Sequence, residues 1–245
     1  MRVRFGTLTV MRLFYLLGLI AVTAMAGPLK FSSGETRAHL IELYSSEGCS
    51  SCPPAEAWIG GLRDAPGLWR DFVPVAFHVN YWDRLGWPDR FARKEFTARQ
   101  YAYAHEWRSG SVYTPEFVLD GEEWRAAFGR NPPPASAEKA GVLTVDYAED
   151  GVCRVHFALS GDYAVNVALL GAGIRSNVRA GENQGRDLRH DFVVLAWKTA
   201  ELSGGTAELS LPKSAEKGIG RQALAVWICR PGELAPVQAT GGWLE

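Results

Sequence analysis

Two cysteines that are separated by two residues, Cys49 and Cys52, are the side chains of this sequence best suited to chemistry. They follow an apolar run at residues 40–44 and precede two prolines. A thiol attacks only as a thiolate, and the start of a helix lowers the pKa of a thiol placed there. We therefore expect Cys49 to be the more exposed, more acidic and attacking thiol. Cys52 is close enough to resolve a mixed disulfide.

Two other interpretations of this pair are half of a zinc site and an inert structural disulfide. A zinc site needs a second Cys-x-x-Cys or a Cys/His pair at ligand spacing. The two remaining cysteines, Cys153 and Cys229, are solitary and distant. The spacing therefore favours a redox pair.

Alternating strand and helix patterns surround the pair. Residues 40–44 and 72–79 are nearly continuous in apolar side chains, which is typical of central strands covered on both faces. Residues 55–62 and 92–107 predict helices, the first beginning at Pro53, where a missing N–H costs nothing. A last strand follows Pro115, and Asp120-Gly121 predicts a hairpin after it.

This order of elements resembles the thioredoxin superfamily, in which the proline at the position of Pro115 is cis and lies against the redox pair. More closely, the chain resembles an uncharacterised family of exported bacterial thioredoxin-like proteins. The similar motifs are Glu-Gly-Cys-Ser-Ser-Cys-Pro-Pro at 47–54, residues 77–87, Tyr-Thr-Pro at 113–115 and Gly-Glu-Asn-Gln-Gly-Arg at 181–186. The thioredoxin resemblance implies disulfide exchange, whereas the closer family implies no particular substrate. A helix closing the sheet is expected to be short, displaced or absent, because residues 122–134 contain Gly129 and three prolines.

The second half of the chain has a different pattern. Seven short strand-like runs with turn residues between them predict a β-sandwich over residues 135–245. The consecutive prolines at 132–134 favour an extended linker. We therefore expect an α/β thioredoxin-like domain at residues 27–134, linker included, followed by an all-β sandwich-like domain.

Residues 1–26 have the charged, apolar and small-residue zones of a secretory signal. The protein is therefore expected to be exported, periplasmic or secreted, with no stable membrane span after cleavage; an uncleaved anchor is the weaker alternative. Removing these 26 of the 245 residues leaves 219 and takes away three arginines, so 26 basic against 27 acidic residues become 23 against 27. This mild acidity, without any basic run, argues against nucleic acid as a partner.

Other residues near the pair have two interpretations each. Glu42, on the first strand, could move protons for the resolving thiol, or it could pair with an arginine. His78 could pair with a thiolate or bind copper together with Cys49 and Cys52, but a hydrogen-bonded structural role is favoured. Thr114, Tyr81 and Trp82 could line a substrate groove with Pro115, or the aromatic rings could cap the core. Glu182, Asn183 and Arg186 are expected to fix a loop or an interdomain contact.

Alternation on two strands of the second half points Cys153 inward and places Cys229 beside Trp227. Two buried cysteines in an exported sandwich most often pair, so we predict a structural disulfide between them. The alternative is two separate buried thiols.

These observations favour a thiol–disulfide oxidoreductase that acts on protein thiols or disulfides and needs no dissociable cofactor. The alternative function is a non-catalytic binding module for copper or a protein partner. The sequence is equally compatible with oxidation of substrate thiols, reduction of substrate disulfides and isomerisation of disulfides. It predicts no particular electron partner or oligomeric state.

Overall fold

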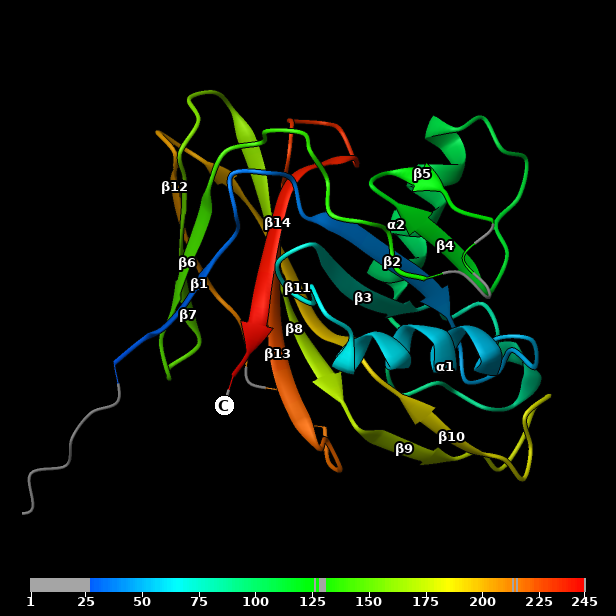
Figure 1. Cartoon of the computed structure of the whole chain (residues 1–245). Coiled ribbons are helices and arrows are strands. Elements are labelled where there is room, and N and C mark those ends of the chain that lie inside the picture. Colours follow the sequence, from blue (N-terminus) through cyan, green and yellow to red (C-terminus); the bar gives the residue numbers. More distant parts are fainter. Residues whose placement is uncertain (1–26, 126, 128–130, 213, 215, 245) are drawn as a thin grey trace, which may run out of the picture.

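The computed structural model of the chain contains two facing β-sheets, with two α-helices against the larger one (Figure 1). It describes residues 27–244 except 126, 128–130, 213 and 215. The predicted signal at residues 1–26 therefore lies outside the described residues. The elements are β1 (Leu29–Ser32), β2 (His39–Ser45), α1 (Pro53–Gly61), β3 (Phe72–His78), α2 (Lys94–Glu106), β4 (Glu116–Leu119), β5 (Glu122–Glu123), β6 (Leu143–Tyr147), β7 (Val152–Phe157), β8 (Tyr163–Ala172), β9 (Ile174–Asn177), β10 (Asp187–His190), β11 (Val193–Leu202), β12 (Thr206–Ser210), β13 (Arg221–Cys229) and β14 (Pro236–Trp243), with short 3-10 helices at Leu62–Asp64 and Asp83–Leu85.

The larger sheet joins both halves of the chain. Its strand order is β14-β13-β8-β11-β3-β2-β4-β5, and β11 meets β3 in parallel through Val193 and Ala76. Phe77 and Trp227, from opposite halves, pack edge to face with ring centroids 6.5 Å apart in one core. The expected boundary at residue 134 therefore does not separate two independent sheets. The prolines there prevent a helix, but they allow the chain to return to the same sheet.

Strand β2 is covered on both faces, as its apolar sequence predicted. Tyr44 packs edge to face on Tyr103 of α2, with centroids 6.4 Å apart. On the other face, Leu43 lies beside Phe117 of β4, and Phe117 packs on Trp58 of α1 at 5.2 Å. Because side chains alternate along a strand, the two helices cover opposite faces of β2.

The second sheet, with the order β1-β6-β7-β12, packs against β8 and β13 through a core of its own. Each of the seven strand-like runs predicted in the second half contains a strand. Strands β9 and β10 were not predicted, because their stretch of the chain is polar and contains Gly173, Gly181 and Gly185. They pair with each other, and β10, which ends at His190, lies beside α1 (Figure 1).

The predicted disulfide between Cys153 and Cys229 is wrong, since both are free, buried thiols. Cys153 belongs to the core between the two sheets, as does Ile228. Cys229 follows Ile228 on β13 and so points to the opposite face, into the other core. Burial raises the pKa of each thiol to about 12, which makes both unreactive.

Several local predictions are confirmed. Helix α1 begins at Pro53, and the Asp120-Gly121 turn joins β4 to β5 with φ angles of 52° and 92°. Of residues 122–134, those that the structure describes contain β5 but no helix. Within the described part of the chain, no helix is long and apolar enough to cross a membrane.

Glu116, the first residue of β4, is 3% exposed. Burial raises the pKa of its carboxyl group from 4.5 to about 7, although Gln100 Nε2 donates a hydrogen bond to it at 2.6 Å. The folded state therefore favours the neutral acid. The contribution of Glu116 to stability is present below the unfolded-state pKa of 4.5 and is lost as the pH rises through the folded-state pKa.

Glu116→Gln should thus raise the free energy of unfolding by about 1–3 kcal/mol near pH 8 and change it little near pH 4. Denaturant unfolding at the two pH values measures this difference. Glu122→Gln, at an exposed position of β5, is the matched control and should show no such pH-dependent gain. Equal effects of Glu116→Gln at both pH values would contradict the prediction.

Candidate functional site

Cys49 and Cys52 form a disulfide in the loop between β2 and α1. Cys52 is the N-cap residue of α1, and its amide donates a hydrogen bond to the Cys49 carbonyl at 3.3 Å. Pro53 takes the next position, where a missing N–H leaves no donor unsatisfied. The pair therefore lies between the carboxyl end of a buried parallel strand and the start of a helix, where the sequence predicted it.

Both members of the disulfide are buried, with exposed fractions of 0% for Cys49 and 1% for Cys52. The expectation that Cys49 is the more exposed of the two is therefore wrong. Trp82 packs very close to Gly48, the residue before Cys49. A Cβ atom added to Gly48 would lie 2.9 Å from the Cβ atom of Trp82. The loop thus needs glycine at position 48 for close approach.

The residues expected to form a groove do gather beside Cys49. The Thr114–Pro115 peptide bond is cis, as the resemblance to thioredoxins implied. Cys49 Sγ lies 3.7 Å from the Thr114 carbonyl oxygen, and Trp82 Nε1 donates a hydrogen bond to Thr114 Oγ1 at 2.8 Å. Tyr81 packs on Trp82 with centroids 6.3 Å apart and donates from its hydroxyl to Gln100.

A turn between β9 and β10, residues 178–186, lies against the disulfide from the second half of the chain. The buried Asn183 Nδ2 donates to the carbonyl oxygens of Glu47 and Cys49, each at 2.9 Å. Glu182 Oε2 accepts from the amide and the hydroxyl of Ser50 at 3.1 and 2.7 Å. These contacts hold the loop that carries the disulfide, residues 46–52, which we call the disulfide loop. Holding a loop is one of the two roles that the sequence favoured for Glu182 and Asn183.

Glu42 has the second of its two predicted roles. Its carboxylate is fully buried and accepts two hydrogen bonds from Arg99, from Nε at 2.8 Å and from Nη2 at 2.9 Å. The hydroxyls of Tyr44 and Tyr103 donate to the same carboxylate. Both oxygens are therefore held in an ion pair, and burying an unpaired charge would be costly.

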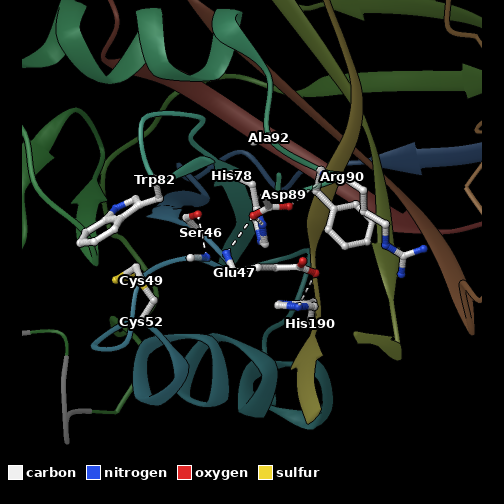
Figure 2. A network of polar contacts seen from close by, with 12 residues as sticks. Ser46, Glu47, Cys49, Cys52, His78, Trp82, Asp89, Arg90, Ala92 and His190 are labelled. Carbon is white, nitrogen blue, oxygen red and sulfur yellow. Dashed lines mark hydrogen bonds and ion pairs between the residues drawn. A yellow bond between two sulfur atoms is a disulfide. The ribbon is translucent and has the colours of Figure 1, made fainter. Parts of the chain in front are cut away.

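His78 lies in a group of five buried ionisable side chains that we call the His78–His190 cluster; Figure 2 labels Glu47, His78, Asp89 and His190. Its members are Glu47, Glu56, His78, Asp89 and His190. His78 Nδ1 is 2.7 Å from Asp89 Oδ2, and His78 Nε2 is 3.3 Å from Glu56 Oε1. The ring nitrogens of His78 thus face carboxylates and not the cysteines, so the alternative copper site of Cys49, Cys52 and His78 is not assembled here.

His190 enters the cluster from β10. Its Nδ1 is 3.3 Å from Glu56 Oε2, and its Nε2 is 3.3 Å from Glu47 Oε1. Burial alone would lower the pKa of His190, but Glu56 and Glu47 outweigh that effect and raise it to about 9. Burial likewise opposes ionisation of His78, yet Asp89 and Glu56 raise its pKa well above its usual value.

A pocket of about 410 Å³ connects the disulfide with this cluster. Cys52, Glu56 and His190 all line it, as do Arg63, Arg186 and Arg189 near its rim. A small molecule or ion in this pocket would contact both Cys52 of the disulfide and the cluster. Sequence reasoning singled out only His78 from the cluster, because the ribbon that carries His190 was not predicted.

The chain was compared with known proteins. A family model described as Protein of unknown function (DUF1223) matches residues 40–229. Among solved structures, protein AGR_C_4864 from Agrobacterium tumefaciens is 26% identical, with a TM-score of 0.58 over 85% of this chain and 95% of that one. HBP35 of Porphyromonas gingivalis, 14% identical, has a TM-score of 0.53 over 86% of this chain and 76% of its own, a likeness of fold alone. No curated protein matches.

The residues matched by the family model include the disulfide, all five members of the His78–His190 cluster and the turn at residues 178–186, which lies against the disulfide loop. The chain therefore belongs to this family of proteins of unknown function (DUF1223).

Proposed function

We propose that this protein is an exported thiol–disulfide oxidoreductase that works through Cys49 and Cys52. The observation that carries the proposal is the place of the disulfide, closed at the N-cap residue of α1 and beside the Thr114 carbonyl. The order β2, α1, β3, α2, β4 and β5 supports assigning this part of the chain to the thioredoxin superfamily. Export is supported by the signal-like sequence of residues 1–26.

In the proposed reaction a substrate thiolate attacks Cys49 Sγ, the Cys49–Cys52 bond breaks, and Cys52 leaves as a thiolate. A second substrate thiolate then attacks the substrate sulfur of the mixed disulfide and releases Cys49. Two electrons pass from the substrate to the pair, and the two substrate protons reach the two cysteines through water. The reverse sequence reduces a substrate disulfide.

Two features favour a thiolate at Cys49. Ser51 Oγ lies 3.3 Å from Cys49 Sγ and can donate a hydrogen bond to it. The unpaired amides at the start of α1 lower the pKa of a nearby thiol. Because both cysteines are buried, a substrate must first displace part of the turn at residues 178–186, which we call the covering turn.

Single cysteine variants test the assignment of roles. With a reduced peptide that contains two cysteines and with glutathione disulfide as oxidant, the wild-type chain should oxidise the peptide over many turnovers. With glutathione disulfide and no peptide, Cys52→Ser should accumulate a mixed disulfide between Cys49 and glutathione, since the thiol that would resolve it is gone. Mass spectrometry detects that species.

The control is the variant Cys49→Ser/Cys52→Ser, which should oxidise the peptide at the uncatalysed rate. A wild-type rate equal to that of this control would refute the proposed activity. A mixed disulfide that forms only in Cys49→Ser would instead reverse the roles of the two cysteines.

The covering turn should limit how fast the disulfide reacts. Asn183→Ala removes two hydrogen bonds to the disulfide loop, each of which contributes about 0.5–1.5 kcal/mol to stability. Opening of the turn would become easier by about that sum. We therefore expect the reduction of the disulfide by dithiothreitol to be roughly tenfold to a hundredfold faster.

Gln184→Ala is the matched control, because Gln184 is the exposed neighbour in the same turn. It should react at the wild-type rate. If Asn183→Ala folds, as judged by its thermal unfolding, and still reacts at the wild-type rate, the turn does not control access to the disulfide.

A further inference from the structure

The His78–His190 cluster holds five ionisable side chains at almost no exposure. The exposed fractions are 0% for His78, 1% for Glu47 and His190, and 5% for Glu56 and Asp89. Buried ionised groups require close partners, because the desolvation of an isolated charge is very costly. The partners in this cluster are mostly other members of the cluster.

Each imidazole has one nitrogen that faces an outer carboxylate, and that of His78 is hydrogen-bonded to it. His78 Nδ1 is held by Asp89, which itself accepts hydrogen bonds from the amides of Glu47 and Phe91 at 2.8 and 2.9 Å. His190 Nε2 faces Glu47, whose other carboxylate oxygen accepts a hydrogen bond from Trp87 Nε1 at 2.6 Å. Histidines that bind metals are oriented in this way by carboxylates on the nitrogen away from the ion.

The inner nitrogens, His78 Nε2 and His190 Nδ1, both face the carboxylate of Glu56, each at 3.3 Å from one of its oxygens. A charge-assisted hydrogen bond between such groups is about 2.7–2.9 Å long. Two ligands that each lie about 2.0–2.1 Å from one tetrahedral ion are about 3.3 Å apart. His190 Nδ1 is hydrogen-bonded to Glu56 at this distance, whereas His78 Nε2 has no hydrogen bond, and both distances are close to the spacing of two ligands around an ion.

Hydrogen bonding in the cluster is also incomplete. Four buried atoms of the cluster have no hydrogen-bond partner of suitable geometry: His78 Nε2, Glu56 Oε1, His190 Nε2 and Glu47 Oε1. Buried polar atoms without a partner are rare and need an explanation such as an ion. One ligand atom from each of Glu56, His78 and His190 lies within 4.8 Å of the other two.

We propose that Glu56, His78 and His190 form a binding site for a divalent transition metal ion, with Zn²⁺ as the ion that best fits the ligands. Two imidazoles and one carboxylate suit Zn²⁺, whereas Mg²⁺ and Ca²⁺ prefer oxygen ligands alone. Asp89 and Glu47 are positioning residues that hold the two rings. The site does not depend on the redox function proposed for the cysteines.

Charge balance supports such an ion. Three carboxylates and two protonated imidazoles carry a net charge of minus one. Three carboxylates, two neutral imidazoles and one divalent ion carry the same net charge. The ion can therefore replace two protons in this buried position without adding a net charge, and binding should release protons.

The pocket beside Cys52 gives this site its entrance. Glu56 and His190 line the pocket, whereas His78 does not line it and is fully buried. Three protein ligands leave the fourth position of a tetrahedral ion for water or for a bound molecule in the pocket. Zinc sites with such an open position are typical of catalysis, whereas structural sites have four protein ligands.

Titration of the full chain with Zn²⁺ tests the site, after treatment with a chelator and with the disulfide kept oxidised. Calorimetry should show one ion bound per chain, and the heat should depend on the buffer because protons are released. Glu56→Gln and His190→Gln should each weaken binding by about 100-fold. His156→Gln, an exposed histidine on β7, is the control and should bind like the wild type.

X-ray absorption at the zinc edge of the wild-type protein needs no buried substitution and so does not depend on how the variants fold. It should show nitrogen and oxygen neighbours without sulfur. The variant Cys49→Ser/Cys52→Ser should bind Zn²⁺ as tightly as the wild type. Sulfur ligands, no stoichiometric binding by the wild type, or unchanged binding in folded Glu56→Gln and His190→Gln would each overturn the proposal.

Discussion

The backbone of Glu47 is bound on both sides by side chains from distant parts of the chain, and the disulfide loop depends on these two contacts. Its N–H donates to Asp89 Oδ2 at 2.8 Å, and its carbonyl oxygen accepts from Asn183 Nδ2 at 2.9 Å. The chain leaves the β2 ladder at this point, so its polar groups lose their strand partners and are buried. Buried peptide groups need new partners, and these two side chains supply them.

The same contacts couple the loop to the His78–His190 cluster. Asp89 Oδ2 accepts from the Glu47 amide and also orients His78 Nδ1. The side chain of Glu47 faces His190, while its backbone leads directly into Gly48 and Cys49. A movement of this loop would therefore change both the position of the disulfide and the outer partners of the two imidazoles.

Much of the fold could be predicted from local patterns. The apolar run of β2, the start of α1 at Pro53 and the Asp120-Gly121 turn all follow from short-range rules of burial, capping and turn geometry. The continuity of the larger sheet could not be predicted, since a parallel contact such as that between β3 and β11 leaves no local signal. The same limit applies to Cys229, whose strand is apolar on both faces and gives no indication of which core it enters.

The candidate site divides in the same way. The cysteines, Thr114 and Pro115 are close in space because they lie at the ends of β2 and β4, which are neighbouring strands of one sheet. The role of Glu42 depended on Arg99, which lies 57 residues away on α2, so the sequence allowed two roles and the structure shows one. Glu56 and His190 come from α1 and β10, and only the unpredicted ribbon brings them together.

The second half of the chain therefore completes the site and is not an appended unit. Asn183 and Glu182 hold the disulfide loop, and His190 supplies one of the two imidazoles beside Glu56. Without these residues the carbonyl of Glu47 would lose its partner, and the Glu56 carboxylate would keep a single histidine beside it. Because desolvated groups of this kind are stable only with their partners, the buried site can exist only in the folded whole chain, where both halves share one sheet and one core.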